Sequence, residues 1–355
     1  MRRCSHSEAI YPLITHVGIA VSVYTSGGKD DILRYCEALH EDTAVVVMVG
    51  GDGTLHETPH LCIVPCGSGN AVANSLSGLQ MSVCNSVLSL IHGTTTDTTP
   101  MSVTLPTTAT EETTVYSTCV LSCGFHAKLI EQSDRLRWFG RSRFTMVAAK
   151  LLMWPPNTDT VVKLYRARDT SKGEHVPMRD THTAEAPEKD ACSSQDFTTL
   201  NGQLRYFIAS KVAELEPGFT IAPYAHAAMR GMDILAVDEV APDSTSLTTI
   251  LGAVGKGDRG SEHLDLYGAE VQCLRTEKFD IYLGKDNGLV CVDGELFRIP
   301  PSAFHAPCRT GADRMTVTQC DASAYSVPCC EPIAGYSRPI KVRPSPVKIT
   351  MYCAK

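Results

Sequence analysis

Short apolar runs and helix-like segments alternate along the first hundred residues. The apolar runs predict strands at 17–24, 43–49 and 62–65. The polar–apolar periodicity between them predicts helices at 30–39, 70–76 and 82–92, the last closed by Gly93. The run TAVVVMV at 43–49 is rich in β-branched residues, which is typical of a strand buried on both faces of a parallel sheet. This order predicts an α/β lobe with a parallel sheet over residues 1–98.

From residue 101 onward the pattern changes to many strands and few helices. The expected strands are 115–122, 160–165, 204–210, 232–237, 268–274, 279–283 and 288–292. The expected helices are 126–138, 141–153 and 244–254. We therefore predict a mostly antiparallel β-sandwich lobe over 99–320, with the active-site cleft between the two lobes.

Two further segments lack an apolar period. Residues 166–200 are polar, charged and aperiodic, which predicts a disordered insertion. The Pro-rich, slightly basic residues 321–355 predict a flexible tail.

Composition narrows the class of protein. The 355 residues carry 32 basic and 39 acidic side chains, a net charge of −7, which argues against a protein built to hold nucleic acid. No apolar stretch reaches the roughly 18 residues of a transmembrane helix. The 15 cysteines are scattered without a CxxC pair, so we expect reduced thiols in a cytoplasmic protein.

Two glycine-rich loops follow predicted strands. Gly50-Gly51-Asp52-Gly53-Thr54 lets backbone amides approach a phosphate, and Asp52 is available to accept a proton or help hold a metal. Pro65-Cys66-Gly67-Ser68-Gly69-Asn70 leads into a helix, the arrangement that favours anions. Either motif alone could be a tight turn, but two of them at neighbouring strand ends favour a phosphate site.

These loops carry a family resemblance. GGDGTLHE followed by PCGSGNAVANSL resembles the catalytic domain of the diacylglycerol, sphingosine and ceramide kinase family, and is most similar to sphingosine kinases. NAD kinases and phosphofructokinases share the first loop but lack the second. The resemblance continues through GFHAKLIEQSDRLRWFGRSRFT at 124–145 and VDGE at 292–295, and covers about residues 17 to 298.

The resemblance implies a lipid kinase that transfers the γ-phosphate of ATP to the primary hydroxyl of a sphingoid base. It implies Asp52 as general base, ATP and Mg²⁺ as cofactors, and a lipid substrate presented at a membrane surface. We expect a cytoplasmic enzyme with peripheral membrane association. The implied nucleotide-binding positions are Gly50, Gly51, Gly53, Thr54, Glu57, Gly67, Ser68, Gly69, Asn70, Arg137, Arg143, Asp293, Gly294, Glu295 and Thr25. Asp293 and Glu295 are also the implied metal ligands.

Three departures from the family pattern leave alternatives open. The family's upstream NPxxGxG loop has no counterpart, so we expect the first lobe to be truncated at its start. Only residues 58–61 separate the HE from the second loop, where the family has a helix. The acidic pair that flanks the head group in sphingosine kinases falls on Lys128 and Ile130. A ceramide or diacylglycerol kinase, or a degenerate non-catalytic relative, therefore remains as an alternative.

Single segments also have plainer interpretations. The arginines of 135–143 could form a solvated helix face, and VDGEL could be a hairpin turn. The apolar residues Phe139, Phe144, Met146 and Leu151 could line an acyl tunnel or simply belong to the core.

Overall fold

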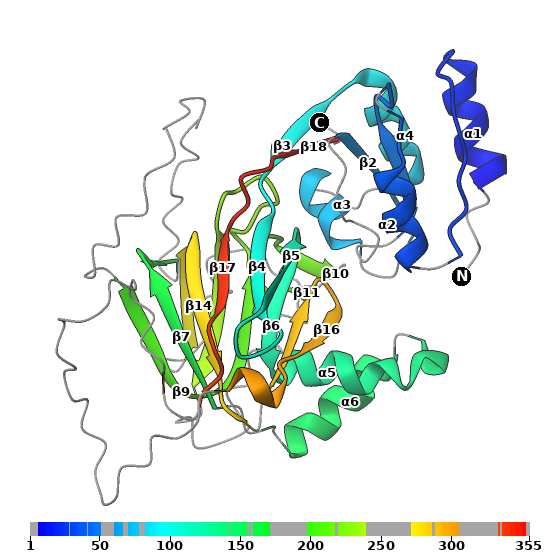
Figure 1. Cartoon of the computed structure of the whole chain (residues 1–355). Coiled ribbons are helices and arrows are strands. Elements are labelled where there is room, and N and C mark those ends of the chain that lie inside the picture. The colour runs from blue at the N-terminus through cyan, green and yellow to red at the C-terminus, as the bar shows by residue number, and fades with distance from the viewer. Residues whose placement is uncertain are drawn as a thin grey trace, which may run out of the picture.

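The chain folds into an α/β lobe, here called the first lobe, and an antiparallel β lobe (Figure 1). The computed structural model describes residues 6–27, 29–40, 42–50, 60–66, 70–77, 82–140, 142–154, 156, 159–170, 197–216, 219–238, 271–285, 288–304, 333 and 336–352. This arrangement confirms the predicted fold class, with a parallel sheet in the first part and antiparallel strands in the second.

The sheet of the first lobe combines residues from both ends of the chain. Its strands lie in the order β1 (Val46–Gly50), β2 (His60–Pro65), β18 (Ile349–Tyr352) and β3 (Thr95–Thr98). β2 is parallel to both β1 and β18, whereas β18 and β3 are antiparallel. Val46 and Met48 pack into one apolar cluster and Val47 into another, so β1 is covered on both faces over residues 46–48 as predicted. Val49, near the end of this edge strand of the described sheet, is 37% exposed.

Within the described ranges four helices accompany this sheet, and three of them match predicted ones. They are α1 (His6–His16), α2 (Lys29–Glu37), α3 (Ala71–Ser77) and α4 (Val83–His92). Ser82 caps the start of α4, because its Oγ accepts a hydrogen bond from the amide of Asn85 at 3.1 Å, and Gly93 caps the end with a φ of 69°. Its buried Val87 packs with Val64 of β2, so α4 covers one face of the sheet.

The predicted strand at 17–24 is wrong. These residues follow α1 without forming helix or strand, and Val17 and Val23 are exposed. The chain is held instead against α2, because Tyr24 stacks on Tyr35 at 4.0 Å and the amide of Gly27 donates to Asp31 at 2.8 Å. Contacts with α2 therefore replace the strand pairing that the apolar run predicts.

The β lobe is built from one extensive set of antiparallel strands and a separate antiparallel pair, β10 and β11. Its elements are β4 (Met101–Pro106), β5 (Glu112–Ser117), β6 (Val120–Gly124), β7 (Asp159–Tyr165), β8 (Arg168–Asp169), β9 (Phe197–Ser210), β10 (Glu214–Glu216), β11 (Phe219–Thr220), β12 (Met232–Asp238), β13 (Val271–Thr276), β14 (Lys278–Leu283), β15 (Leu289–Val292), β16 (Glu295–Arg298) and β17 (Ile340–Pro344). The single strand predicted at 115–122 is in fact β5 and β6, which are separated by Thr118 and Cys119.

The long strand β9 joins the two layers of this lobe. Its first half pairs with β7, and its second half pairs with β6 and β12. Alternate side chains of β9 enter different cores: Phe207 packs in the cluster that also holds Phe279 of β14, whereas Tyr206 packs with Phe125. The second cluster is covered by α5 (Phe125–Asp134) and α6 (Ser142–Met153), which the short helix η2 (Arg137–Phe139) connects. It also includes Met48 and Met351 of the first lobe.

The predicted insertion and tail are shorter than expected. β8 and the start of β9 occupy both ends of the 166–200 segment, and residues 171–196 lie outside the described part of the chain, as does the predicted helix at 244–254. The 321–355 tail contains β17 and β18. Apolar side chains of these strands, Ile340, Val342 and Met351, are fully buried, as alternation along a strand allows. The flexible-tail prediction is therefore wrong for residues 340–352.

Two neighbouring connections link the lobes. The chain leaves the first lobe between β3 and β4 and returns to it between β17 and β18 (Figure 1). The amide of Ser345 donates to the carbonyl of Pro100 at 2.7 Å, so the two connections are hydrogen-bonded to each other.

Ending the chain at Ser345 removes β18 and should destabilise the first lobe. β2 and β3 then lose their shared neighbour and the fully buried Met351, a loss of about 3 kcal/mol or more in the free energy of unfolding. Urea unfolding followed by circular dichroism measures this, with a chain ending at Tyr352 as the control. Equal stability of the two shortened chains would contradict the structural role of β18.

Candidate active site

The two glycine loops begin at adjacent strand ends. In the β1–β2 ladder Gly50 pairs with Pro65, so both loops leave the same carboxyl edge of a parallel pair. That edge is where open α/β sheets bind ligands. The remaining predicted loop residues lie outside the described part of the chain: Gly51, Asp52, Gly53, Thr54, Glu57, Gly67, Ser68 and Gly69.

Asn70 connects the second loop to α3. Its φ is 56°, the left-handed conformation that asparagine tolerates, and its carbonyl accepts the amide of Asn74 at 3.0 Å. α3 in turn meets the β lobe, because the Oγ of Ser75 accepts the amide of Ala227 at 3.2 Å. The second glycine loop is therefore anchored at its helix end by contacts with both lobes.

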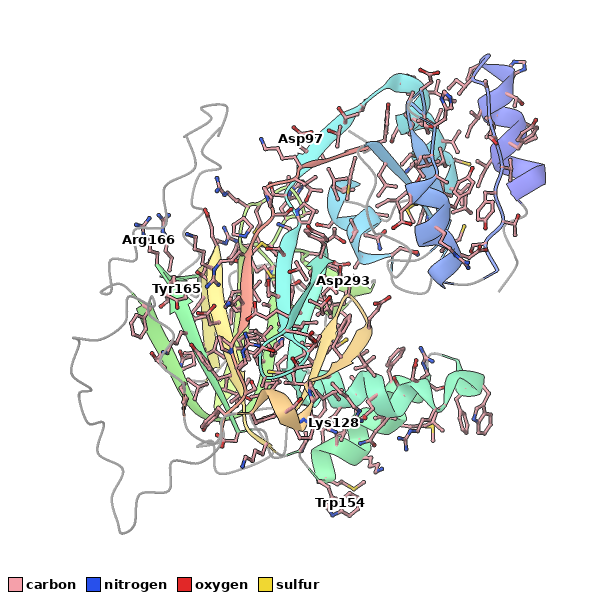
Figure 2. The ribbon with its side chains drawn as sticks, in the orientation of Figure 1. Asp97, Lys128, Trp154, Tyr165, Arg166 and Asp293 are labelled. Carbon is pink, nitrogen blue, oxygen red and sulfur yellow. The ribbon has the colours of Figure 1, made fainter. Side chains whose placement is uncertain are left out.

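The predicted ligand Asp293 is a buried hydrogen-bond acceptor (Figure 2). Its Oδ1 accepts from the Ser117 hydroxyl at 2.8 Å and from the amides of Cys119 and Val120 at 3.2 and 2.7 Å. Its Oδ2 accepts from the amide and hydroxyl of Thr118 at 2.7 and 3.3 Å. Both carboxylate oxygens therefore hold the turn between β5 and β6.

The predicted hairpin geometry around Asp293 is also present. Asp293 and Gly294 connect β15 to β16 with φ values of 47° and 87°, as a tight hairpin turn requires. Glu295 then begins β16 and is partly exposed.

The described residues do not fit a Mg²⁺ site at Asp293. Five hydrogen bonds from the chain already use its two oxygens, which leaves no free face for a metal ion. Within the described ranges no three histidine, cysteine, aspartate or glutamate side chains gather as a metal site would need. In this geometry Asp293 has a structural role, and the metal role of Glu295 stays a prediction.

Lys211 lies behind the same turn and was missed by the sequence analysis. It is fully buried, and its Nζ donates to the carbonyl of Met229. Burial lowers the pKa of Lys211 to about 8, and the nearby Asp293 carboxylate opposes part of that shift. Its backbone amide also donates to Cys119 at 2.8 Å. A single lysine after a strand carries no sequence signal that its side chain is buried behind the β5–β6 turn.

The head-group positions implied by the resemblance lie on α5. The Nζ of Lys128 pairs with Glu131 at 3.0 Å, and Glu131 also pairs with Arg298 of β16. Ile130 packs against the apolar cluster of Ala127, Leu289 and Cys291. The carboxylate of Glu131, which pairs with Lys128, is thus shared by two cations.

The remaining predicted residues lie on separate elements. Thr25 is exposed in the segment that runs beside α2. The guanidinium of Arg143, on α6, lies 4.6 Å from the centre of the Phe144 ring. Arg137 lies in η2, and its side chain is outside the described part.

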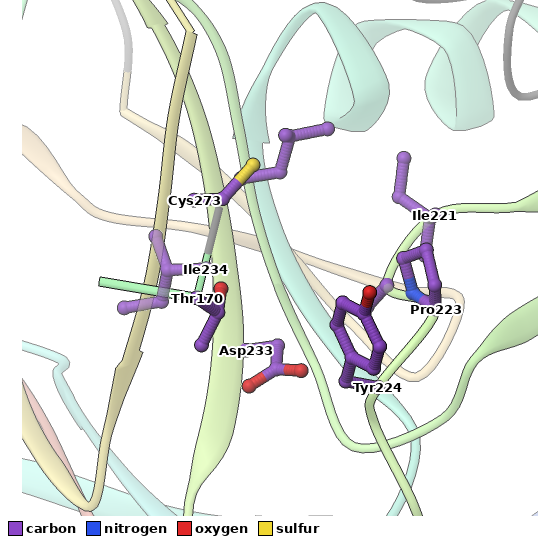
Figure 3. A pocket seen from close by; sticks show the side chains of 9 residues that line it. Thr170, Ile221, Pro223, Tyr224, Asp233, Ile234 and Cys273 are labelled. Carbon is purple, nitrogen blue, oxygen red and sulfur yellow. The ribbon is translucent and has the colours of Figure 1, made fainter. Parts of the chain in front are cut away.

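A small pocket lies elsewhere in the β lobe (Figure 3). Ile221, Pro223, Tyr224, Ile234 and Cys273 form most of its wall. Its one carboxylate, Asp233, is paired with Arg275 through two contacts of 2.5 and 2.8 Å. No predicted site residue lines this pocket, and its carboxylate already forms an ion pair with Arg275. We therefore do not assign the active site to it.

Replacing Asp293 with asparagine should destabilise the β lobe without any ligand present. The amide NH₂ would face backbone donors that now bind a carboxylate, which costs about 2–3 kcal/mol of unfolding free energy. Urea unfolding without ATP or Mg²⁺ measures this, and Glu295→Gln is the matched control. A loss of stability no larger than that of the control would contradict the structural role of Asp293.

Acid should weaken the attachment of α5. Burial lowers the pKa of His126 to about 4, and its Nδ1 lies 3.3 Å from the hydroxyl of Tyr206. Between pH 6.5 and 4 the unfolded chain binds a proton that the folded chain excludes, so stability falls by up to about 3 kcal/mol as the pH drops. Urea midpoints across this range should fall further for the unchanged chain than for His126→Asn. Parallel pH profiles would show that His126 does not contribute.

Comparison with known proteins agrees with this architecture. Residues 4–103 match the family described as the diacylglycerol kinase catalytic domain. A crystal structure described as a diacylglycerol kinase from Bacillus anthracis str. Sterne aligns with a TM-score of 0.52 at 10% identity, covering 96% of this chain and 88% of that one. Another structure from the same organism gives a TM-score of 0.54 at 10% identity, covering 97% and 89%. No curated protein sequence matches the chain.

At these identities the structures establish a shared fold. The predicted resemblance is supported at the level of the diacylglycerol kinase catalytic domain, and the closer similarity to sphingosine kinases remains a prediction. No helix of the described ranges has the length and apolarity to cross a membrane. The chain therefore has a lipid-kinase-like fold, with a diacylglycerol kinase catalytic domain match in its first hundred residues.

Proposed function

We propose that this protein is an ATP-dependent lipid kinase that phosphorylates a primary hydroxyl. The observation that carries the proposal is the pairing of Gly50 with Pro65, since it starts both glycine loops at one sheet edge. The family match over 4–103 and the shared fold support the same conclusion.

In the proposed reaction the loop amides bind phosphate oxygens and Asp52 accepts the proton of the lipid hydroxyl. Glycines allow the backbone to approach the phosphates closely, and a carboxylate within hydrogen-bond reach suits the general base. The hydroxyl oxygen then attacks the γ-phosphorus and ADP leaves. Since Asp293 does not fit a metal in this geometry, no step is assigned to a protein-bound Mg²⁺.

The ion pairs on α5 favour a lipid without a positive charge in its head group. A sphingoid base carries an ammonium group, which needs a carboxylate partner. Glu131 already pairs with Lys128 and Arg298, so an ammonium group there would have to displace a cation. We therefore propose a neutral head group of the diacylglycerol or ceramide class, with the sphingoid base as the second candidate.

Transfer of labelled phosphate from ATP should depend on Asp52. With sphingosine, ceramide and diacylglycerol tested side by side, we expect label on a neutral lipid and a loss of 100-fold or more in Asp52→Asn, in line with the roughly 10²–10⁴ contribution of a general base. The exposed Asp42 provides the matched control, Asp42→Asn, which should keep full activity.

Each other outcome has a defined meaning. Label on sphingosine alone would overturn the neutral head group while keeping the kinase. Label that persists in Asp52→Asn would overturn the role of Asp52. Absence of both label and ATP binding would overturn the proposed activity and favour the non-catalytic relative.

A further inference from the structure

The segment from η2 to the residue after α6 carries large apolar side chains exposed to solvent. Trp138 is 76% exposed, Trp154 69% and Met153 65%, and Phe139 and Met146 are also exposed. We call these five residues the α6 strip. The two helices α5 and α6 project from the β lobe, and Trp154 lies at the end of α6 (Figure 2). Since η2 connects these two helices, the strip runs from their connection to the end of α6.

Packing in the core does not account for the apolar character of these exposed side chains. α6 buries Val147 and Leu151 against the β lobe, which uses the opposite face of the helix. Met146 and Met153 are seven residues apart and so share one face. Phe144 packs against the core whereas Phe139 and Met146 are exposed, so these side chains do not share one apolar lining within the described part of the chain.

The segment that contains the strip has a net charge opposite to that of the whole protein. Residues 135–154 contain Arg135, Arg137, Arg141, Arg143 and Lys150 and no acidic residue, although the chain has a net charge of −7. Arg135 and Lys150 are exposed, and the Nζ of Lys150 donates to Gln132 at 3.1 Å. Basic side chains beside exposed tryptophan and methionine match the chemistry of an anionic membrane surface.

We propose that the α6 strip docks the protein on an anionic lipid surface. The tryptophans insert at the level of the head groups, where their rings are most stable, and the basic residues pair with anionic lipids. A second copy of the chain is a poorer partner, because a symmetric contact would bring the two basic segments together. The purpose of this docking rests on the proposed function, but the binding itself requires no catalysis.

Intrinsic fluorescence gives a direct test, since both tryptophans of the chain belong to the strip. On vesicles of phosphatidylcholine containing phosphatidylserine, the emission should shift to the blue and brominated lipid should quench it. Pure phosphatidylcholine should give a weaker response, and added salt should reduce binding to the anionic vesicles.

Variants connect the signal to the strip. In vesicle co-sedimentation, Trp138→Ala with Trp154→Ala should weaken binding by roughly tenfold or more, since each ring buries apolar area. Arg135→Glu with Lys150→Glu should weaken binding to anionic vesicles only. Leu88→Ala with Val347→Ala changes exposed apolar residues elsewhere and serves as the control.

Two results would overturn the proposal. One is binding by the tryptophan variant equal to that of the control. The other is a dimer in sedimentation that the tryptophan variant abolishes, which would assign the strip to a second copy.

A parallel kinase assay separates this proposal from the proposed function. The tryptophan variant should keep its activity on detergent-dispersed lipid and lose it on vesicles. An inactive protein that still binds vesicles through the strip would refute the kinase and leave the docking surface.

Discussion

The return of the chain to its first lobe is the constraint on which the site depends. β18 lies between β2 and β3, so the last described residues complete the sheet whose edge carries both glycine loops. The connection before β18 is hydrogen-bonded to the one that leaves β3. A sheet completed in this way ties the position of the loops to the folding of the whole β lobe.

A second constraint is the buried carboxylate of Asp293. A buried charge is costly unless it is fully hydrogen-bonded, and here five donors from residues 117–120 satisfy it. Asp293 thus fixes the β15–β16 hairpin to the β5–β6 turn, with Lys211 behind them. The acidic residue that resembles a ligand in the sequence acts in this geometry as a structural link, and it positions Glu295, which follows in the same hairpin.

The sequence predicted those elements whose stability is local. α4 has its own caps in Ser82 and Gly93, and the β-branched run at β1 forms the parallel strand. The sequence-based predictions were wrong where contacts with distant parts of the chain determine the structure. An apolar run at 17–24 contacts α2 instead of a strand, and a Pro-rich tail becomes β18 only because β2 and β3 lie open to it. The site showed the same division: the loop motifs are local, whereas the donors to Asp293 lie more than 170 residues away in the chain.

The two faces of α6 bring these arguments together. Its inner face closes the cluster that Met48 and Met351 of the first lobe also enter, so the helix is held in place by the same core that supports the sheet of the loops. Its outer face is free to be apolar because nothing in the described fold requires it for packing. A helix fixed on one side and apolar on the other can hold a membrane surface in a constant orientation to the fold. In the proposed lipid kinase reaction, a fixed orientation to the membrane would supply the positioning of the acceptor that phosphoryl transfer depends on.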